Sequence, residues 1–429
     1  MKKIFRKIHL WLSVPFGIFI TLICFSGAML VFEKEITEWC RPDIYFVKEV
    51  RETPISIDSL MERVSATLPD DVTATGLTVP ADACRTWQVG LSKPRRASIY
   101  VDPYTGEVTG RSERLPFYNT MFHLHRWMMG TSSGFGKLLV GISTLMLVVI
   151  LLTGILMWLT NRRKPLAKSL KISFTQGWPR FWHDLHVAGG IYATIFLLAI
   201  ALTGLTWSFT WYRTAFYNLF GAEASVGEHG NGRMPEKSSA EGHPDNHERP
   251  SDALTADVHN VRNGKAHRGG GGRRNGKYGG RHKSANVRQD ETYTAAPDTI
   301  VMVEPRPASP FAQWQKVYVA LAQAHPGYRQ ITLSNGHAGL VPAGRNSLRA
   351  ADRYDFDAAT GEVTAVTPYS EQPKSARVRG IVYTVHVGSW GGWLTRIITF
   401  LSVLLGATLP LTGYYLWIKR LLAKSKHKQ

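Results

Sequence analysis

The sequence predicts an α-helical membrane protein: a four-helix transmembrane bundle in two repeated halves, with two small α+β modules. Four apolar stretches, an uneven placement of positive charge and an internal repeat predict this fold. Each apolar stretch approaches the roughly 20 residues that a helix needs to cross the hydrocarbon core of a bilayer. The stretches cover residues 10–32, 138–159, 187–209 and 394–418.

Composition agrees with apolar spans inside a mixed chain. Apolar residues make up 44% of the 429 residues, yet the mean hydropathy is only -0.12, so the apolar residues are concentrated in some segments. The fourth stretch contains Arg396 and Pro410. An arginine near a helix end can reach the headgroups, and proline is tolerated in membrane helices, so we count four spans.

The basic residues indicate how the chain is oriented. The formal charge is +19, and three segments rich in Lys and Arg, residues 1–8, 161–180 and 419–429, contain no acid. All three fall on one side if the four helices cross in turn. Because cytoplasmic loops carry an excess of Lys and Arg, we expect both termini in the cytoplasm and the two long segments outside, across a bacterial inner membrane. The charge thus indicates membrane lipid, and not nucleic acid, as the partner.

The first apolar stretch also has features of a cleaved signal peptide. A basic start precedes it, and Ser26-Gly27-Ala28 is a candidate cleavage site. However, the stretch is longer than a usual signal-peptide core, and the repeat described next pairs it with an internal helix that cannot be cleaved. We therefore expect it to be retained as a span.

The repeat relates span one to span three and span two to span four. His9 leads to Ser26-Gly27 at the same spacing at which His186 leads to Thr203-Gly204. Likewise, His125 leads to Thr153-Gly154, and His386 leads to Thr412-Gly413 at a spacing two residues shorter. The outward segments repeat as well. The first has a helix at 57–68, a strand at 98–101 and a turn at 102–108. The second has a helix at 314–323, a strand at 353–356 and a turn at 357–363. The chain therefore reads as two halves, each with a helix, an outward module and a helix.

Two further features bear on the outward segments. Residues 221–298 are rich in Gly, Arg, Asn, Ser and His, with very few large apolar residues, which predicts a disordered insertion. A histidine tract can bind metal, but these histidines lack ligand spacing. Cys40 and Cys84 lie outside the spans and could form a disulfide.

These arguments divide the chain into nine segments. They are span 1 (1–33), outward module 1 (34–122), span 2 (123–160), a cytoplasmic loop (161–182), span 3 (183–212), an outward segment with the insert (213–298), outward module 2 (299–380), span 4 (381–418) and a cytoplasmic tail (419–429).

Four histidines in repeat-related positions are the candidate functional residues. His9 and His186 lie at the predicted cytoplasmic ends of spans one and three, and His125 and His386 at the outward ends of spans two and four. A single histidine there would most simply be bonded to water or headgroups. Four at matched depths favour ligands of two b-type haems, because haem fits between facing helices and two neutral imidazoles fill both axial positions of its iron. Such an iron has no open site for oxygen, so its role would be electron transfer.

Neighbouring residues leave alternatives open. His183 and His123 lie close in sequence to two of the candidates, and either could be a ligand or a hydrogen-bonding partner instead. The repeat favours His186 and His125. Arg6, Arg126 and Arg180 are candidate partners for haem propionates, since guanidinium pairs well with carboxylate, although each could simply anchor a helix at the headgroups.

The chain resembles the PepSY-associated transmembrane family, which includes iron-regulated membrane proteins and siderophore-iron reductases of bacteria. The resemblance covers nearly all of the chain apart from the insert. It rests on the Lys-Ile-His-Leu-Trp opening, Leu124-His125-Arg126, His183-Asp-Leu-His186, the turns at 102–108 and 357–363, and the Thr-Gly-x-x-x-Trp ending of span four. It implies PepSY modules in the periplasm, haem bound by histidines and the reduction of ferric siderophores, with release of Fe(II).

Three functions follow as hypotheses. The first is an oxidoreductase in which electrons pass from the cytoplasmic to the periplasmic haem and on to a ferric acceptor. No G-x-G-x-x-G follows a strand, so the expected donor is a separate reduced flavin, a reductase or quinol. The second is a haem-free protein whose modules bind peptides or regulate a peptidase. The third is a siderophore permease, disfavoured because no span contains an acid.

Overall fold

A computed structural model describes residues 2–94, 96–132, 134–160, 170–223 and 309–426. Nearly all of the insert predicted to be disordered, together with its histidines, lies outside the described residues. So do residues 161–169 of the predicted cytoplasmic loop and residues 427–429 of the tail.

Four helical runs among the described residues are long and apolar enough to cross a membrane. They are α1 (Lys2–Leu30), α6 (Phe135–Leu159), the continuous run of α8 (Trp178–Asp184), the π-helix η1 (Leu185–Gly189) and α9 (Gly190–Ser208), and α13 (Gly392–Lys426). Large apolar side chains such as Ile18, Leu138, Ile195 and Leu401 are exposed on them. Because water-facing helices rarely expose so much apolar surface, these helices form a transmembrane bundle.

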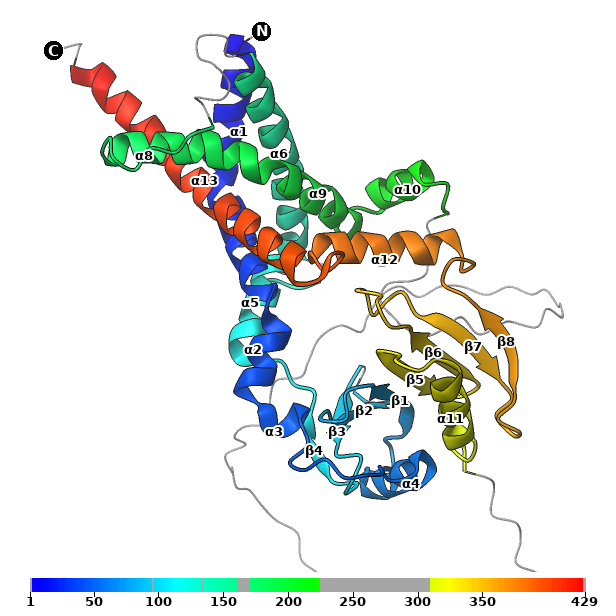
Figure 1. The fold of residues 1–429 in the computed structure, drawn as a ribbon. Coiled ribbons are helices and arrows are strands. Elements are labelled where there is room, and N and C mark those ends of the chain that lie inside the picture. Colours follow the sequence, from blue (N-terminus) through cyan, green and yellow to red (C-terminus); the bar gives the residue numbers. More distant parts are fainter. Residues whose placement is uncertain (1, 95, 133, 161–169, 224–308, 427–429) are drawn as a thin grey trace, which may run out of the picture. The chain divides into compact units, whose positions relative to one another are not determined.

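The bundle is held by close packing of its helices. α1 packs against α13 and α6, and α9 packs against the same two helices (Figure 1). Between them lies an apolar core that includes Ile20, Leu197 and Val403. A Cβ atom added to Gly17 would lie 2.5 Å from the Tyr414 hydroxyl, so this glycine lets α1 and α13 approach closely.

The second and fourth spans are each preceded by a separate short helix. The sequence instead predicts one uninterrupted segment for each span, at 123–160 and 381–418. α5 (Pro116–Trp127) ends where Met128 and Met129 adopt left-handed backbone angles, with φ of 46° and 64°. α12 (Lys374–His386) is followed by Gly388, whose φ is 73°. The turns place His125 and His386 in the last turns of these short helices.

The outward modules meet in one eight-stranded antiparallel sheet, in the order β4-β3-β2-β1-β5-β6-β7-β8 (Figure 1). Its strands are β1 (Ala74–Pro80), β2 (Trp87–Leu91), β3 (Ser98–Val101), β4 (Val108–Arg111), β5 (Gln330–Ser334), β6 (His337–Val341), β7 (Asp352–Phe356) and β8 (Val363–Thr367). β1 pairs with β5 from Gly76↔Ser334 to Pro80↔Gln330. The sequence predicts two modules but not this junction, which satisfies the backbone groups that each edge strand would otherwise leave unpaired.

Two helices pack with the sheet around one core. α4 (Ile57–Thr67) and α11 (Trp314–Ala324) contribute buried side chains such as Leu60 and Val317, which meet strand residues such as Leu77 and Leu333. The backbone N–H of Ile57 donates to Gln315 Oε1 at 2.8 Å, which ties the two helices together. The remaining helices are α2 (Glu33–Cys40), α3 (Pro42–Tyr45) and α10 (Thr210–Leu219).

Candidate functional site

The four candidate histidines lie in the bundle as two facing pairs. The ring centroids of His9 and His186 are 6.4 Å apart, with the ring planes at 89°. Those of His125 and His386 are 6.1 Å apart, with the planes at 51°. All four rings are partly buried. The fold thus brings together, from four different helical runs, the same partners that the sequence pairs.

Each histidine has its Nδ1 atom against a backbone carbonyl oxygen of another helix. The distances are 3.1 Å from His9 to Ile150, 3.1 Å from His186 to Leu409, 2.9 Å from His125 to Ile23 and 3.0 Å from His386 to Ile200. Since a carbonyl oxygen can only accept, Nδ1 must carry the proton in each neutral ring. Nε2 then keeps its lone pair, and no hydrogen bond to Nε2 of these four rings is formed among the described residues. Each ring is therefore oriented as a ligand that binds through Nε2.

A hydroxyl and a glycine follow each of these carbonyls, three and four residues further along the helix. The hydroxyls of Thr153, Thr412 and Thr203 lie 3.2, 2.9 and 3.3 Å from Nδ1 of their histidines. Each threonine donates its own proton to a carbonyl one turn back, so it can accept from Nδ1. Ser26 occupies the fourth position but donates to Leu22 and Ile23.

The glycines leave room for the imidazole rings. A Cβ atom added at Gly27, Gly204, Gly413 or Gly154 would lie 2.8, 3.0, 3.4 or 3.5 Å from Cε1 of the facing histidine. In the sequence these Ser-Gly and Thr-Gly pairs mark the repeat, and no chemical role is predicted for them. Their recurrence in all four spans was the signal that could have revealed such a role, although each glycine contacts a histidine other than the one it follows in the repeat.

His186 is presented by the wider turn of η1, a feature often found at functional sites. Just before it, the buried Asp184 accepts hydrogen bonds from Arg180 Nε at 2.8 Å and from His183 Nδ1 at 3.1 Å. The sequence makes Arg180 a candidate partner for a haem propionate and His183 an alternative ligand. The structure places them on this carboxylate, and it is His186 that faces His9.

The other candidates are also placed. The His123 ring packs against Trp127, with centroids 4.9 Å apart, and no histidine ring faces it among the described contacts. Arg6 is exposed on α1. The Arg126 guanidinium lies 5.3 Å from the centroid of Phe122, and within the described parts of the chain it forms no ion pair. Of the three candidate arginines, Arg6 and Arg126 are thus free of ion pairs among the described residues, and Arg126 is the one next to a paired histidine, His125.

The two histidine pairs lie at different depths of the bundle. His9 and Ile23, which contacts His125, are fourteen residues apart on α1, or about 21 Å along a helix axis. His186 and Ile200, which contacts His386, are also fourteen residues apart. The pairs therefore lie near opposite ends of the spanning helices.

Outside the bundle, titratable side chains form a cluster on the sheet. Asp355 accepts from His337 Nδ1 at 2.7 Å and from Arg353 Nε at 2.9 Å. Burial alone would raise the pKa of Asp355, but these donors outweigh it and the pKa is lowered. The carboxylate is thus satisfied by its own neighbours.

Two further observations concern the thiols and the metal-ligating side chains of the described residues. Cys40 and Cys84 are free thiols, so the disulfide that could join them is not formed. No group of three or more His, Cys, Asp or Glu side chains that could hold a metal ion occurs in the described ranges. Each histidine pair offers two protein ligands, which is fewer than a structural zinc site needs and the number that a haem iron uses.

A family model described as the PepSY-associated TM region matches residues 6–420. The match extends from before His9 into the last turns of α13, and so includes both histidine pairs and the sheet. A comparison with curated protein sequences gives no match.

Proposed function

This chain belongs to the PepSY-associated transmembrane family, and from that premise we propose that it is a di-haem b oxidoreductase of the bacterial inner membrane. It moves electrons from the cytoplasmic side to a ferric acceptor in the periplasm. The acceptor we propose is a ferric siderophore, so that the reaction serves iron acquisition.

The spacing of the histidine rings is the observation that carries this proposal. An iron held between two imidazole nitrogens, each about 2 Å away, would keep the ring centroids roughly 6 Å apart. The centroids are 6.4 and 6.1 Å apart. Both pairs therefore fit an iron porphyrin.

The protein groups around each pair supply orientation and electronic tuning. The carbonyl oxygens of Ile150, Leu409, Ile23 and Ile200 fix the Nδ1–H tautomer and make Nε2 a stronger donor. Haem bound there would supply a reversible ferric and ferrous couple near each end of the bundle. Two histidines would hold each haem and leave no open site for oxygen, so the group would supply electron transfer without oxygen chemistry. Arg126, next to His125 and without an ion pair among the described residues, would hold a propionate.

The direction of transfer rests on the placement of charge. In the proposed topology both termini are cytoplasmic, the two halves are repeats, and the sheet is periplasmic. His9 and His186 then receive electrons from a reduced flavin, a reductase or quinol. His125 and His386, about 21 Å further along the bundle, deliver them outside.

An absorption spectrum of the purified protein tests the proposal first. We expect Soret and α bands of low-spin b-type haem that change reversibly on reduction, and two haems per chain by pyridine haemochrome assay. A colourless protein, purified folded after expression with ample haem, would refute the proposal.

Matched histidine variants then test the ligands. His186→Ala should lower the haem content from two per chain to one, whereas His183→Ala, three residues away, should leave two. His386→Ala should also leave one, and the remaining haem should still be reducible from the cytoplasmic side while ferric reduction outside stops. Equal haem content in His186→Ala and His183→Ala would contradict the assignment.

A further inference from the structure

An apolar pocket of about 510 Å³ opens beside the bundle at the end that carries His125 and His386. Residues from α1, α2, α5 and α13 line it: Ala28, Met29, Phe32, Ile36, Cys40, Leu115, Phe117, Tyr118 and Phe400. None of the four candidate histidines lines the pocket, so it is distinct from the site described above. Its volume lies within the range of pockets that bind small organic ligands.

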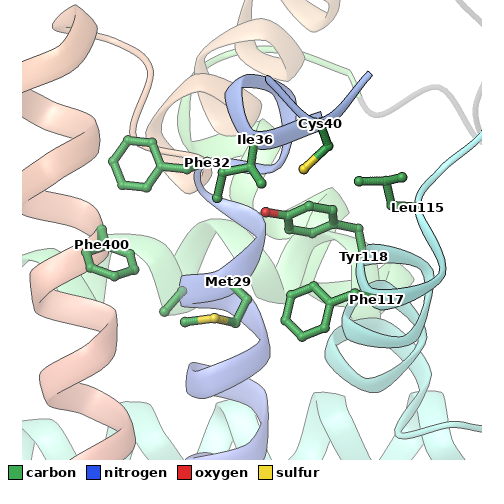
Figure 2. A pocket seen from close by; sticks show the side chains of 9 residues that line it. Met29, Phe32, Ile36, Cys40, Leu115, Phe117, Tyr118 and Phe400 are labelled. Carbon is green, nitrogen blue, oxygen red and sulfur yellow. The ribbon is translucent and has the colours of Figure 1, made fainter. Parts of the chain in front are cut away.

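One hydroxyl is directed into this apolar space. Tyr118 is only 3% exposed, and Figure 2 shows its ring crossing the pocket with the hydroxyl pointing away from α5 towards Phe32 and Ile36. The hydroxyl forms no hydrogen bond with any described residue. The hydroxyl thus opens into the pocket with no acceptor from the described chain, so a ligand with a hydrogen-bond acceptor at this point would pair with it.

The lining restricts the chemistry of that ligand. It contains no Lys, Arg or His side chain, so it offers no counter-ion to a phosphate headgroup. An acyl chain would fill the space but leave the hydroxyl unpaired. Four aromatic rings, those of Phe32, Phe117, Phe400 and Tyr118, favour a flat ring. The ligand is thus a flat, membrane-soluble ring that carries a carbonyl oxygen.

We propose that this pocket binds the head ring of a membrane quinone, with the Tyr118 hydroxyl donating a hydrogen bond to a quinone carbonyl.

The pocket lies near the pair formed by His125 and His386. Tyr118 and His125 are seven residues apart on α5, so they lie on the same helix face about 10 Å apart along its axis. Ala28 of the pocket wall is next to Gly27 in the chain. The His125 ring packs against Gly27, where a side chain would leave no room for it.

The consequence for electron supply rests on the proposed function. Oxidation of one quinol to quinone releases two electrons and two protons. The electrons reduce two ferric chelates to the ferrous state, and the protons go to the water outside. The quinol pool would then supply the pair of His125 and His386 from within the bilayer, in addition to donors on the cytoplasmic side.

Binding of a short-tailed ubiquinone, decylubiquinone, to the full-length protein in detergent tests the proposal. Tyr118→Phe keeps the ring but removes the hydroxyl, and we expect the Kd to rise about tenfold, as for loss of one hydrogen bond. Ile36→Trp, at an exposed position of the rim, fills the pocket and should weaken binding at least as much. Tyr415→Phe, on an exposed part of α13 outside the pocket, is the control and should bind as the parent does.

Unchanged Kd values in both Tyr118→Phe and Ile36→Trp would overturn the proposal. So would displacement of the quinone by a saturated phospholipid at equal concentration, which would show a site for acyl chains. Haem content is measured in the same samples. Loss of quinone binding with both haems present concerns the pocket alone, whereas Tyr118-dependent quinone binding by a haem-free protein would refute the proposed function and leave the pocket standing.

Discussion

The two ends of the bundle present their histidines in different ways. His9 and His186 lie on the membrane-spanning runs themselves, within α1 and η1. His125 and His386 lie at the ends of α5 and α12, which turn before the next span begins. The first pair is therefore fixed by packing inside the spans, whereas the second also depends on two turns. The same contacts to carbonyl oxygens are thus reached by two local structures.

The two ends also differ in how tightly the histidines pack. A Cβ atom at Gly27 or Gly204 would lie 2.8 or 3.0 Å from the ring of His125 or His386, closer than ordinary contact. At Gly154 and Gly413 the distances to His9 and His186 are 3.5 and 3.4 Å, which is ordinary van der Waals contact. The pair of His125 and His386 has less room to adjust, so identical changes should have unequal effects at the two ends.

The largest expected effect comes from alanine at these glycines. Gly27→Ala should displace His125, whose ring cannot retreat without losing its bond to Ile23, and lower the haem content from two per chain towards one. Gly154→Ala should keep both haems. Overpacking of a buried site costs about 1–3 kcal/mol, so the thermal midpoint of Gly27→Ala should fall as well.

Haem content by pyridine haemochrome assay and unfolding followed by tryptophan fluorescence measure the two effects. Parallel behaviour of the two variants would show that the closer packing of the pair of His125 and His386 has no consequence.

A smaller effect is expected from the carboxylates near the two ends. Asp184 holds Arg180 and His183, and its side chain is 6% exposed. Glu35 pairs with Arg396 and is 28% exposed. Since a carboxylate that is more buried loses more when its charge is removed, Asp184→Asn should lower the unfolding free energy by about 2 kcal/mol and Glu35→Gln by about 1 kcal/mol.

Equilibrium unfolding in mixed detergent gives both values. If Glu35→Gln is the more damaging change, burial is not what distinguishes the two ion pairs.

Much of the bundle could be predicted from the sequence because its signals are local. Hydropathy located the four helical runs, a finding confirmed by the helices that are long enough to span a membrane. The family was also correctly identified from short motifs. The pairing of His9 with His186 and of His125 with His386 followed from the repeat, and the structure places the ring centroids of these pairs 6.4 and 6.1 Å apart.

The remaining features depend on contacts that sequence periodicity does not report. A hydropathy window reports the apolar stretches at 138–159 and 394–418, which begin after the turns that follow Trp127 and His386, but it does not report the short helices before those turns. The β1–β5 junction joins strands about 250 residues apart, with the unassigned insert between them. Tyr118 gave no signal because an isolated tyrosine at a helix N-terminal turn is common. Long-range packing, rather than local preference, decides all three.

The smallest expected effect concerns the hydroxyl that lies near each histidine. It compares the haem potentials at the two ends of the bundle. The Thr412 hydroxyl is 2.9 Å from His186 Nδ1, slightly closer than the Leu409 carbonyl at 3.1 Å. Thr412→Val removes this acceptor but leaves the carbonyl. Nε2 then becomes a weaker donor, which favours ferrous iron, so the midpoint potential of one haem should rise. A loss of about 0.5 kcal/mol corresponds to roughly 20 mV for one electron.

Ser26→Ala is the matched change at the other end. The Ser26 hydroxyl donates to Leu22 and Ile23 and forms no hydrogen bond with His125 among the described residues, so neither haem potential should shift. Redox titration of the α band measures both variants. Equal shifts would mean that the two hydroxyls act by bending their helices, because of Ser26 and Thr412 only Thr412 is bonded to an imidazole. A shift in Thr412→Val alone would instead assign the effect to the hydrogen bond of His186 Nδ1. The haem whose potential shifts would then be the one held by His9 and His186.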